Sequence, residues 1–129
     1  MTSQDNRHVV EQFWAAMDTN DFRVAAAWLH DDYQLDWPQS QERIRGRDNF
    51  VAVNEHYPAA GPWQFVVERL VAGEDEVVTD ITVTDGVTVA RAITFSRVCD
   101  GKIVRQTEYW PDPYPAPAWR ARWVEPIEE

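Results

Sequence analysis

The chain has a single cysteine, Cys99, among its 129 residues. It can form no internal disulfide, so we expect a reducing compartment. No apolar run approaches the ~20 residues needed to span a bilayer, and the N-terminus lacks the charged, apolar and small-residue order of a signal peptide. We therefore predict a cytoplasmic protein that does not enter a membrane.

Basic residues are also scarce. Lysine and arginine number 12 against 22 aspartates and glutamates, which gives a net charge of -10. Phosphates would be repelled by this charge, which argues against nucleic acid or anionic lipid as the main partner. With 44% hydrophobic residues, the chain is long enough for one domain with a real core and too short for two.

The motifs of several reaction classes are missing. There is no phosphate-binding glycine loop and no Gly-x-Ser-x-Gly turn, and no base lies near Cys99 in the sequence. His8, His30 and His56 fall in three separate predicted elements, without a Cys pair or His-x-x-x-His spacing, so we predict no metal site. The reaction classes that the sequence still allows are acid-base chemistry and ligand binding in a pocket.

The first half of the chain is predicted to be mainly helical. Apolar residues recur at helical spacing over 4–17, from Phe22 to Leu29 after a cap at Asn20-Asp21, and again after Gly46 until Pro58. Between the second and third helices, alternation from Tyr33 to Trp37 predicts a short strand, which Pro38 ends. Helices therefore lead the fold.

From residue 63 the period changes to two. Segments 63–73, 76–84, 87–99 and 102–110 are rich in β-branched and aromatic residues and are separated by turn residues, which predicts an antiparallel meander. Residues 111–129 form a proline-rich tail in which 118–124 predict one or two helical turns, with Trp119 and Trp123 on one face. The order indicates a single α+β domain over 1–129, with helices on one face of a curved sheet.

The loop from Leu35 to Gly46 gathers a tryptophan, two carboxylates and two arginines between rigid elements. Ligands often meet proteins at such loops. Asp36 and Glu42 are candidate acid-base groups, and Arg43 or Arg45 is a candidate anchor for a carboxylate or enolate. A solvated loop with ordinary ion pairs, for example with Glu42 and Asp48, is the competing interpretation.

The last predicted strand offers a second candidate, because Glu108 shares a face with Trp110. Partial burial beside an indole would raise the pKa of this carboxyl, which suits proton transfer near neutral pH. Pairing with an arginine across the sheet is the alternative, as it is for Asp80 in a neighbouring strand. Small residues share one face of the strand 87–99 and fit either a cavity wall or close packing under a helix: Thr88, Ala90, Ala92, Thr94 and Ser96.

The order of these elements resembles the nuclear transport factor 2-like superfamily, and within it SnoaL-like polyketide cyclase-type domains. The resemblance rests on the strand ending in Trp-Pro, on the loop Gln-Ser-x-Glu-Arg-x-x-Gly, and on Asp-Gly-Lys-Ile and Glu-Tyr-Trp around the last strand. It implies a cystatin-like cone, in which two or three N-terminal helices pack into a strongly curved, mainly antiparallel sheet around one deep apolar pocket. It also implies a homodimer through the outer face of the sheet.

The resemblance also compares site residues. Ketosteroid isomerases of this superfamily carry a catalytic aspartate directly before the proline, where this chain has Trp37, with Asp36 one residue early. Their catalytic tyrosine corresponds to Phe13, and their second aspartate falls near Thr94. The acidic residue that SnoaL-like cyclases place late in the final strand is best matched by Glu108.

The expected function is therefore the binding of a hydrophobic small molecule, with or without turnover. As an enzyme, the protein would act without cofactor on a ring-containing carbonyl compound, with Glu108 as general acid or base and Asp36 as second candidate. The alternative is a non-catalytic ligand-binding or dimerisation module. The expected ligand-binding residues are Phe13, Trp14, Trp37, Glu42, Arg43, Tyr57, Thr94 and Trp110.

Overall fold

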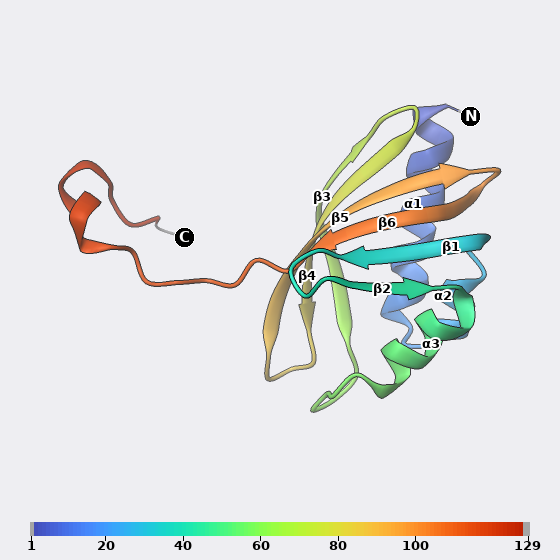
Figure 1. Ribbon diagram of the computed structural model, residues 1–129, viewed down its shortest axis with the longest axis horizontal. Helices are drawn as coiled ribbons and strands as arrows, with labels where there is room; N and C mark the ends of the chain where they lie inside the picture. The colour runs from blue at the N-terminus through green and yellow to red at the C-terminus, as the bar shows by residue number, and fades with distance from the viewer. Residues whose placement is uncertain (1, 128–129) are drawn as a thin grey trace.

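A computed structural model describes residues 2–127, and Figure 1 shows their arrangement. One six-stranded sheet, in the order β2-β1-β6-β5-β4-β3, curves around the first helix. The elements are α1 (Ser3–Asp18), α2 (Phe22–Ala26), β1 (Leu29–Trp37), β2 (Glu42–Arg45), α3 (Arg47–His56), β3 (Gln64–Ala72), β4 (Glu76–Thr84), β5 (Val89–Cys99), β6 (Lys102–Tyr109) and the 3-10 helix η1 (Ala118–Trp123). The predicted α+β cone is confirmed.

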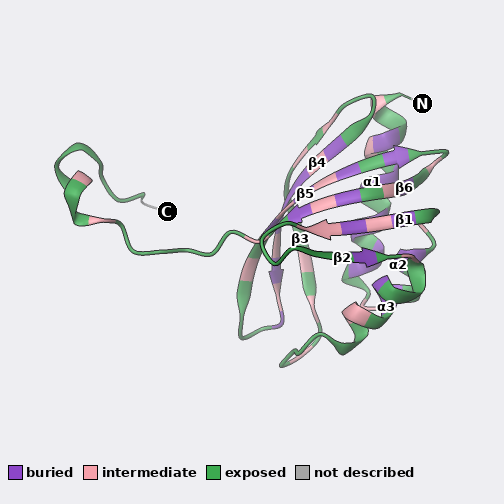
Figure 2. Ribbon diagram, in the orientation of Figure 1, coloured by how far each residue is buried: buried purple, intermediate pink, exposed green. Residues whose placement is uncertain are grey.

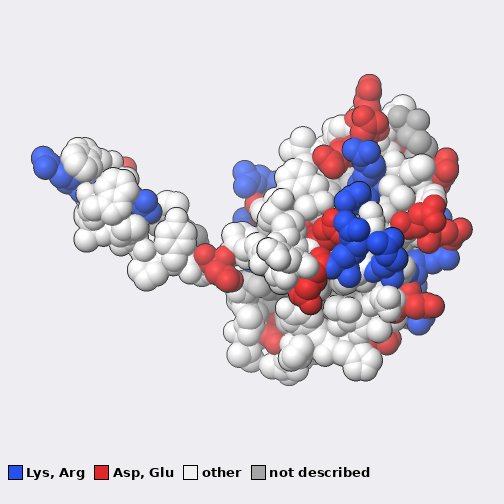
Figure 3. Space-filling view, viewed as in Figure 1, with Lys and Arg blue, Asp and Glu red and all other residues white. Residues whose placement is uncertain are grey.

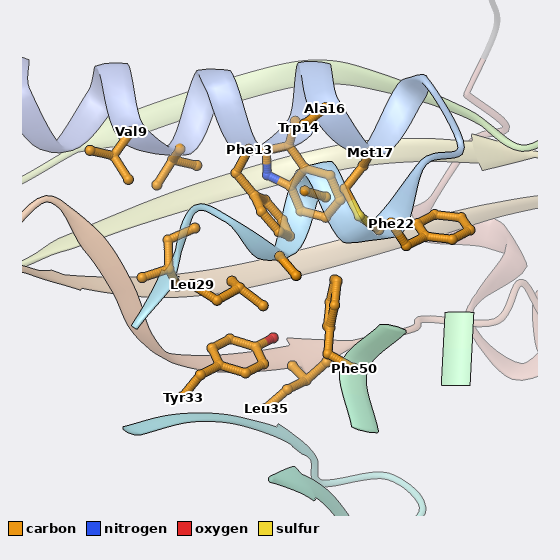
Figure 4. Close-up of a cluster of buried hydrophobic side chains, with 14 of the residues drawn as sticks. Val9, Phe13, Trp14, Ala16, Met17, Phe22, Leu29, Tyr33, Leu35 and Phe50 are labelled. Carbon is orange, nitrogen blue, oxygen red and sulfur yellow. The ribbon is translucent and has the colours of Figure 1, made fainter. Parts of the chain in front are cut away.

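Helix α1 forms where its apolar period predicts it. Thr2 caps the helix in a reciprocal pair with Asp5, in which the Asp5 backbone N–H donates to the Thr2 hydroxyl and the Thr2 backbone N–H donates to the Asp5 carboxylate, both at 3.1 Å. The buried stripe of the helix packs against the concave side of the sheet, as Figure 4 shows for Phe13, Trp14 and Met17. This stripe is the main helical contribution to the core.

The second helix is shorter than predicted. The sequence predicts helix to Leu29, whereas α2 ends at Ala26 and β1 begins at Leu29. The reason is a tertiary contact: the backbone N–H of Ile103 donates to the Trp28 carbonyl at 2.8 Å, and Leu29 is aligned with Ile103 in the sheet. Pairing with β6 therefore overrides the local helical pattern of this segment.

The loop after β1 contains a strand that the sequence analysis did not identify. Residues Glu42–Arg45 form β2, which pairs antiparallel with β1 in a register that sets Asp36 opposite Arg43. Gly46 then turns the chain into α3 at φ +86°, a backbone conformation that favours glycine. The loop thus forms an edge hairpin followed by a helix.

The four C-terminal strands form the predicted antiparallel meander, β3 to β6. The sheet is nevertheless mixed, because β1 runs parallel to β6. Figure 2 shows buried residues alternating with more exposed ones along the strands, as expected when only one face meets the core. The concave face and α1 therefore enclose the space in which a pocket can form.

Basic and acidic side chains gather over the middle of the convex face of the sheet, as Figure 3 shows. On it, Asp80 accepts hydrogen bonds from Arg91 Nε at 2.6 Å and from Arg69 NH2 at 3.0 Å. The arginine pairing expected for Asp80 is thus present. Beyond β6, the chain leaves the body as an extended tail that ends in η1 (Figure 1), where the sequence predicts helical turns. Among the described residues, no helix is long and apolar enough to cross a membrane.

Candidate functional site

A cavity of about 140 Å³ lies between α1, α3 and the concave face of the sheet. Its walls are mostly aromatic and aliphatic, and both helices and five strands or their ends contribute to them. The lining residues are Phe13, Trp14, Met17, Leu35, Trp37, Phe50, Asn54, Tyr57, Trp63, Phe65, Val83, Thr88, Ala90, Gln106, Glu108 and Trp110. Such an apolar pocket with few polar groups is typical of a small-molecule site.

Glu108 is the acidic group of this cavity. Its residue is 6% exposed, and both carboxylate oxygens accept a hydrogen bond. The Trp37 indole Nε1 donates to Oε1 at 3.0 Å, and the Thr94 hydroxyl donates to Oε2 at 2.6 Å. The carboxyl is therefore held in one orientation by side chains from β1 and β5.

Burial raises the pKa of Glu108 above its ordinary value, because the charged form is desolvated. Hydrogen bonds from Thr94, Trp37 and Trp110 oppose this shift by stabilising the carboxylate, but burial has the larger effect. Among residues 2–127, no lysine, arginine or histidine lines the cavity. Within this part of the chain Glu108 therefore has no cation beside it in the pocket, and this arrangement suits a proton donor or acceptor.

A second polar group lies deeper in the cone. The Tyr33 hydroxyl donates to Gln106 Oε1 at 2.5 Å, and Gln106 Nε2 donates to the Ser96 hydroxyl at 3.0 Å. Burial, together with the negative charge of Glu108, raises the pKa of Tyr33, so this phenol stays neutral. The chain of contacts fixes Gln106 in the floor of the cavity.

One hydrogen-bond donor near the cavity is unused. Trp14 lines the cavity, and its indole Nε1 is buried without a partner among the described residues. Figure 4 shows this ring beside Phe13 and Met17 on α1. A buried N–H without a partner is costly, because its hydration is lost and no hydrogen bond replaces it.

The structure brings together most of the residues expected at the site. Phe13, Trp14, Trp37, Tyr57 and Trp110 line the cavity with Glu108, and Thr94 lies under Glu108 as its hydrogen-bond donor. Thr88 and Ala90, from the stripe of small residues on β5, also line the cavity.

Three expected site residues lie elsewhere. Asp36 receives two hydrogen bonds from Arg43, at 2.6 and 3.0 Å, and a third from Arg105 at 3.1 Å. It is not among the lining residues, because neighbours on a strand point to opposite faces and Trp37 points inward. Arg43 is occupied by this ion pair, and Glu42 is exposed on the edge strand β2.

The arginine pairs also lower the pKa of Asp36, first through the hydrogen bonds from Arg43, so this group stays ionised. Alternation along β6 places Gln106 on the same face as Glu108, and this pattern would have identified it as a lining residue. Trp63, Phe65 and Asn54 also line the cavity, but their sequence neighbourhoods carry no comparable signal.

The fold also creates a cluster that sequence spacing does not predict. His30, Cys99 and Asp100 each place a possible metal-ligand atom within 4.8 Å of the others. His30 Nδ1 already accepts the backbone N–H of Asp32 at 3.0 Å, which leaves the proton of a neutral ring on Nε2. Cys99 and Asp100 are exposed, and we assign no metal to this cluster.

Comparison with solved structures agrees with this geometry. A protein from Kribbella flavida DSM 17836, whose name places it among the ketosteroid isomerases, is 30% identical, with 100% of this chain and 95% of that chain covered at a TM-score of 0.90. An NTF-2 like protein of unknown function from Burkholderia xenovorans LB400 is 32% identical. The superposition covers 99% of each chain and has a TM-score of 0.81.

A protein with a ketosteroid isomerase-like fold from Catenulispora acidiphila DSM 44928, solved in complex with trimethylamine, shares the fold at 12% identity. The superposition covers 78% of this chain and 83% of the Catenulispora acidiphila chain, with a TM-score of 0.68. No curated protein matches the chain in sequence. Residues 10–106 match the SnoaL-like domain family. Because this match covers most of the chain, the protein belongs to the SnoaL-like domain family and has the NTF2-like fold.

Proposed function

We propose that the protein binds a small hydrophobic carbonyl compound in the cone cavity and shifts a proton on it through Glu108, without a cofactor. The observation that carries the proposal is the placement of Glu108 as a buried carboxyl among aromatic walls, with a raised pKa and no cation among the lining residues. In this role the Glu108 carboxylate takes a proton from the carbon next to the carbonyl, which leaves an enolate. In an isomerisation, Glu108 returns the proton to another carbon of the conjugated enolate. In a ring closure, the enolate carbon bonds to a second carbonyl carbon of the same molecule, the C=O π electrons move to that oxygen, and Glu108 gives its proton to the new alkoxide.

The size of the cavity restricts the ligand. Its volume of about 140 Å³ is below the roughly 300–1,000 Å³ of pockets for drug-sized molecules. It is close to the ~150 Å³ engineered cavity that binds benzene. The fitting ligand is therefore about one ring in size.

The test begins with the ligand that copurifies with the full-length protein, identified by native mass spectrometry. An identified carbonyl compound is then incubated with the protein in D2O, and deuterium entry beside the carbonyl is followed by NMR. We expect exchange with the native protein and none with Glu108→Gln, while Glu11→Gln, an exposed change on α1, exchanges at the native rate. Equal exchange by Glu108→Gln would eliminate the proton-transfer role.

The second candidate function is non-catalytic binding of a small organic cation. Aromatic walls around a carboxylate are a suitable site for an ammonium group, and the structural neighbour from Catenulispora acidiphila was solved in complex with trimethylamine. The pH dependence separates the two functions. Affinity for trimethylammonium would rise with pH as Glu108 ionises and would be lost in Glu108→Gln, whereas a neutral carbonyl ligand needs no charge on Glu108.

We also propose that the protein is a cytoplasmic homodimer that pairs through the convex face of the sheet. Phe95 and Tyr109 support this, because their rings pack edge to face at 6.3 Å on that side and Tyr109 is 39% exposed. Light scattering over a range of protein concentrations tests the dimer, and cell fractionation tests the location. A single monomeric species at all concentrations would contradict the dimer.

A further inference from the structure

The tail after β6 projects from the domain and has no buried residue. Residues 111–127, here called the arm, extend away from the domain in Figure 1. No residue of the arm is buried, and two tryptophans of η1 are largely exposed, Trp119 at 72% and Trp123 at 69%. Large apolar side chains grouped on a projecting segment are typical of a surface that another molecule covers.

The first part of the arm is built to span a distance. Four of its first seven residues are proline, and Pro117 has polyproline-type angles of φ -65° and ψ 140°. At ~3.1 Å per residue, Pro111 to Pro117 extend about 20 Å. The start of the arm is fixed by two hydrogen bonds to Gln39. The backbone N–H of Trp110 donates to Gln39 Oε1 at 2.5 Å, and Gln39 Nε2 donates to the Trp110 carbonyl at 3.2 Å. A stiff segment with a fixed start carries η1 away from its own domain.

The same arm is present in an experimental structure. Residues 1–110 are 110 of 129, about 85% of the chain, so superposition of the body alone cannot give a TM-score of 0.90. The Kribbella flavida protein reaches this score over 100% of the chain, so part of its arm superposes as well. A segment without contacts would not keep one position in two proteins that are 30% identical.

A second copy of this chain offers a suitable surface. The convex face of β5 and β6 presents the partly buried ring of Phe95 and the more exposed ring of Tyr109. The arm starts directly beyond Tyr109, so an arm that crosses between two facing sheets starts at the edge of that surface.

The arginines of η1 contact its own tryptophans. Within residues 2–127, Arg120 and Arg122 form no ion pair and instead stack over Trp119 and Trp123, at 5.6 and 5.0 Å from the ring centroids. Arg97 and Arg105 are paired across β5 and β6 on the face that carries Phe95 and Tyr109. The contact therefore depends on the aromatic rings and not on charge.

We infer that two copies of this chain exchange their arms, with Trp119 and Trp123 of each packing on the Phe95–Tyr109 surface of the other. The inference rests on the proposed homodimer and is independent of the chemistry at Glu108. Each arm then contributes a separate contact to the interface, in addition to any contact between the two sheets.

Sedimentation of the full-length protein tests the exchange. We expect the double variant Trp119→Ser, Trp123→Ser to raise the dimer dissociation constant by about tenfold or more, as for hot-spot tryptophans. Phe95→Asp should act similarly from the other side of the contact. Val87→Ser, in an exposed turn, is the matched control and should leave the constant unchanged. Circular dichroism must show that all variants are folded.

Mixing the two defective proteins gives the sharper result. In a mixed dimer, the intact arm of the Phe95→Asp copy meets the intact surface of the double tryptophan variant, so one of the two contacts is restored. We expect mixed dimers to form more readily than either variant pairs with itself. A monomeric native protein would overturn both the dimer and the exchange. A native-strength dimer of the double tryptophan variant, or no gain on mixing, would overturn the exchange alone.

Discussion

The Trp37 indole donates its only N–H to Glu108 at 3.0 Å, across 71 residues of sequence. The contact joins the end of β1 to the end of β6, two strands that run parallel in the centre of the sheet. The indole thus orients the one carboxyl that lines the cavity among the described residues.

Removal of either donor should raise the pKa of Glu108 further. Trp37→Phe removes the indole N–H, and Thr94→Val removes the hydroxyl that donates at 2.6 Å. Both donors stabilise the ionised form, so without them the neutral acid is favoured. Titration of the carboxyl carbon by NMR measures the change. An unchanged or lower pKa in both variants would show that these bonds do not stabilise the carboxylate.

Glu108 should cost the protein stability as the pH rises. Its pKa is higher in the folded than in the unfolded protein, so its stabilising effect is full below the unfolded value and is lost as pH rises through the folded value. Glu108→Gln has no charge to bury, and its amide can accept from Trp37 and donate to Thr94. Urea unfolding from pH 4 to pH 8 should show that the free energy of unfolding of the variant increases relative to that of the native protein as the pH rises. A constant difference across this range would contradict the shift.

A ring placed in the cavity should block ligands of one-ring size. Ala90 lines the cavity from β5, so Ala90→Phe fills it, at a cost of about 1–3 kcal/mol if the side chain is too large. Benzene should raise the melting temperature of the native protein, because it binds only the folded state, and should not do so in the variant. Val87→Phe, in a turn outside the cavity, serves as control. An equal shift in both variants would place benzene elsewhere.

Asp80 should stabilise the convex face through its two arginines. Asp80→Asn is expected to lower the free energy of unfolding by about 1–2 kcal/mol, a value reduced because the side chains of Arg91 and Arg69 are 49% and 79% exposed. Because hydrogen bonds from Arg91 and Arg69 lower the pKa of Asp80, this contribution is present above the unfolded pKa and is lost as pH falls through the folded value.

The matched control for Asp80 is Asp48→Asn. Asp48 pairs with Arg23 at 2.9 Å, but its side chain is 94% exposed. Solvent screens such a pair, so this variant should unfold like the native protein in the same urea titration. Equal losses of stability in the two variants would show that the burial of Asp80 does not strengthen its ion pairs.

The strands from β3 to β6 could be predicted because each carries its own period-two pattern and ends at turn residues. The edge strand β2 could not be predicted, since the charged residues Glu42, Arg43 and Arg45 give it no apolar alternation and only pairing with β1 holds it in an extended conformation.

The predicted end of α2 was wrong for a related reason. Trp28 and Leu29 continue the helical pattern in the sequence. The helix nevertheless ends before them, because the Trp28 carbonyl accepts a hydrogen bond from the backbone N–H of Ile103, 75 residues away.

Within the site, alternation by itself determined that Glu108 shares a face with Trp110 and that Trp37 and Asp36 point to opposite faces, because side-chain direction on a strand has a fixed period of two. Which face meets the core is not encoded in that period. Only the tertiary structure decided that Trp37 and Glu108 meet in the cavity while Asp36 is held by Arg43 and Arg105 outside it. The reason is that β1 meets β6 across about 70 residues of sequence, and that Arg43 reaches Asp36 only through the pairing of β2 with β1.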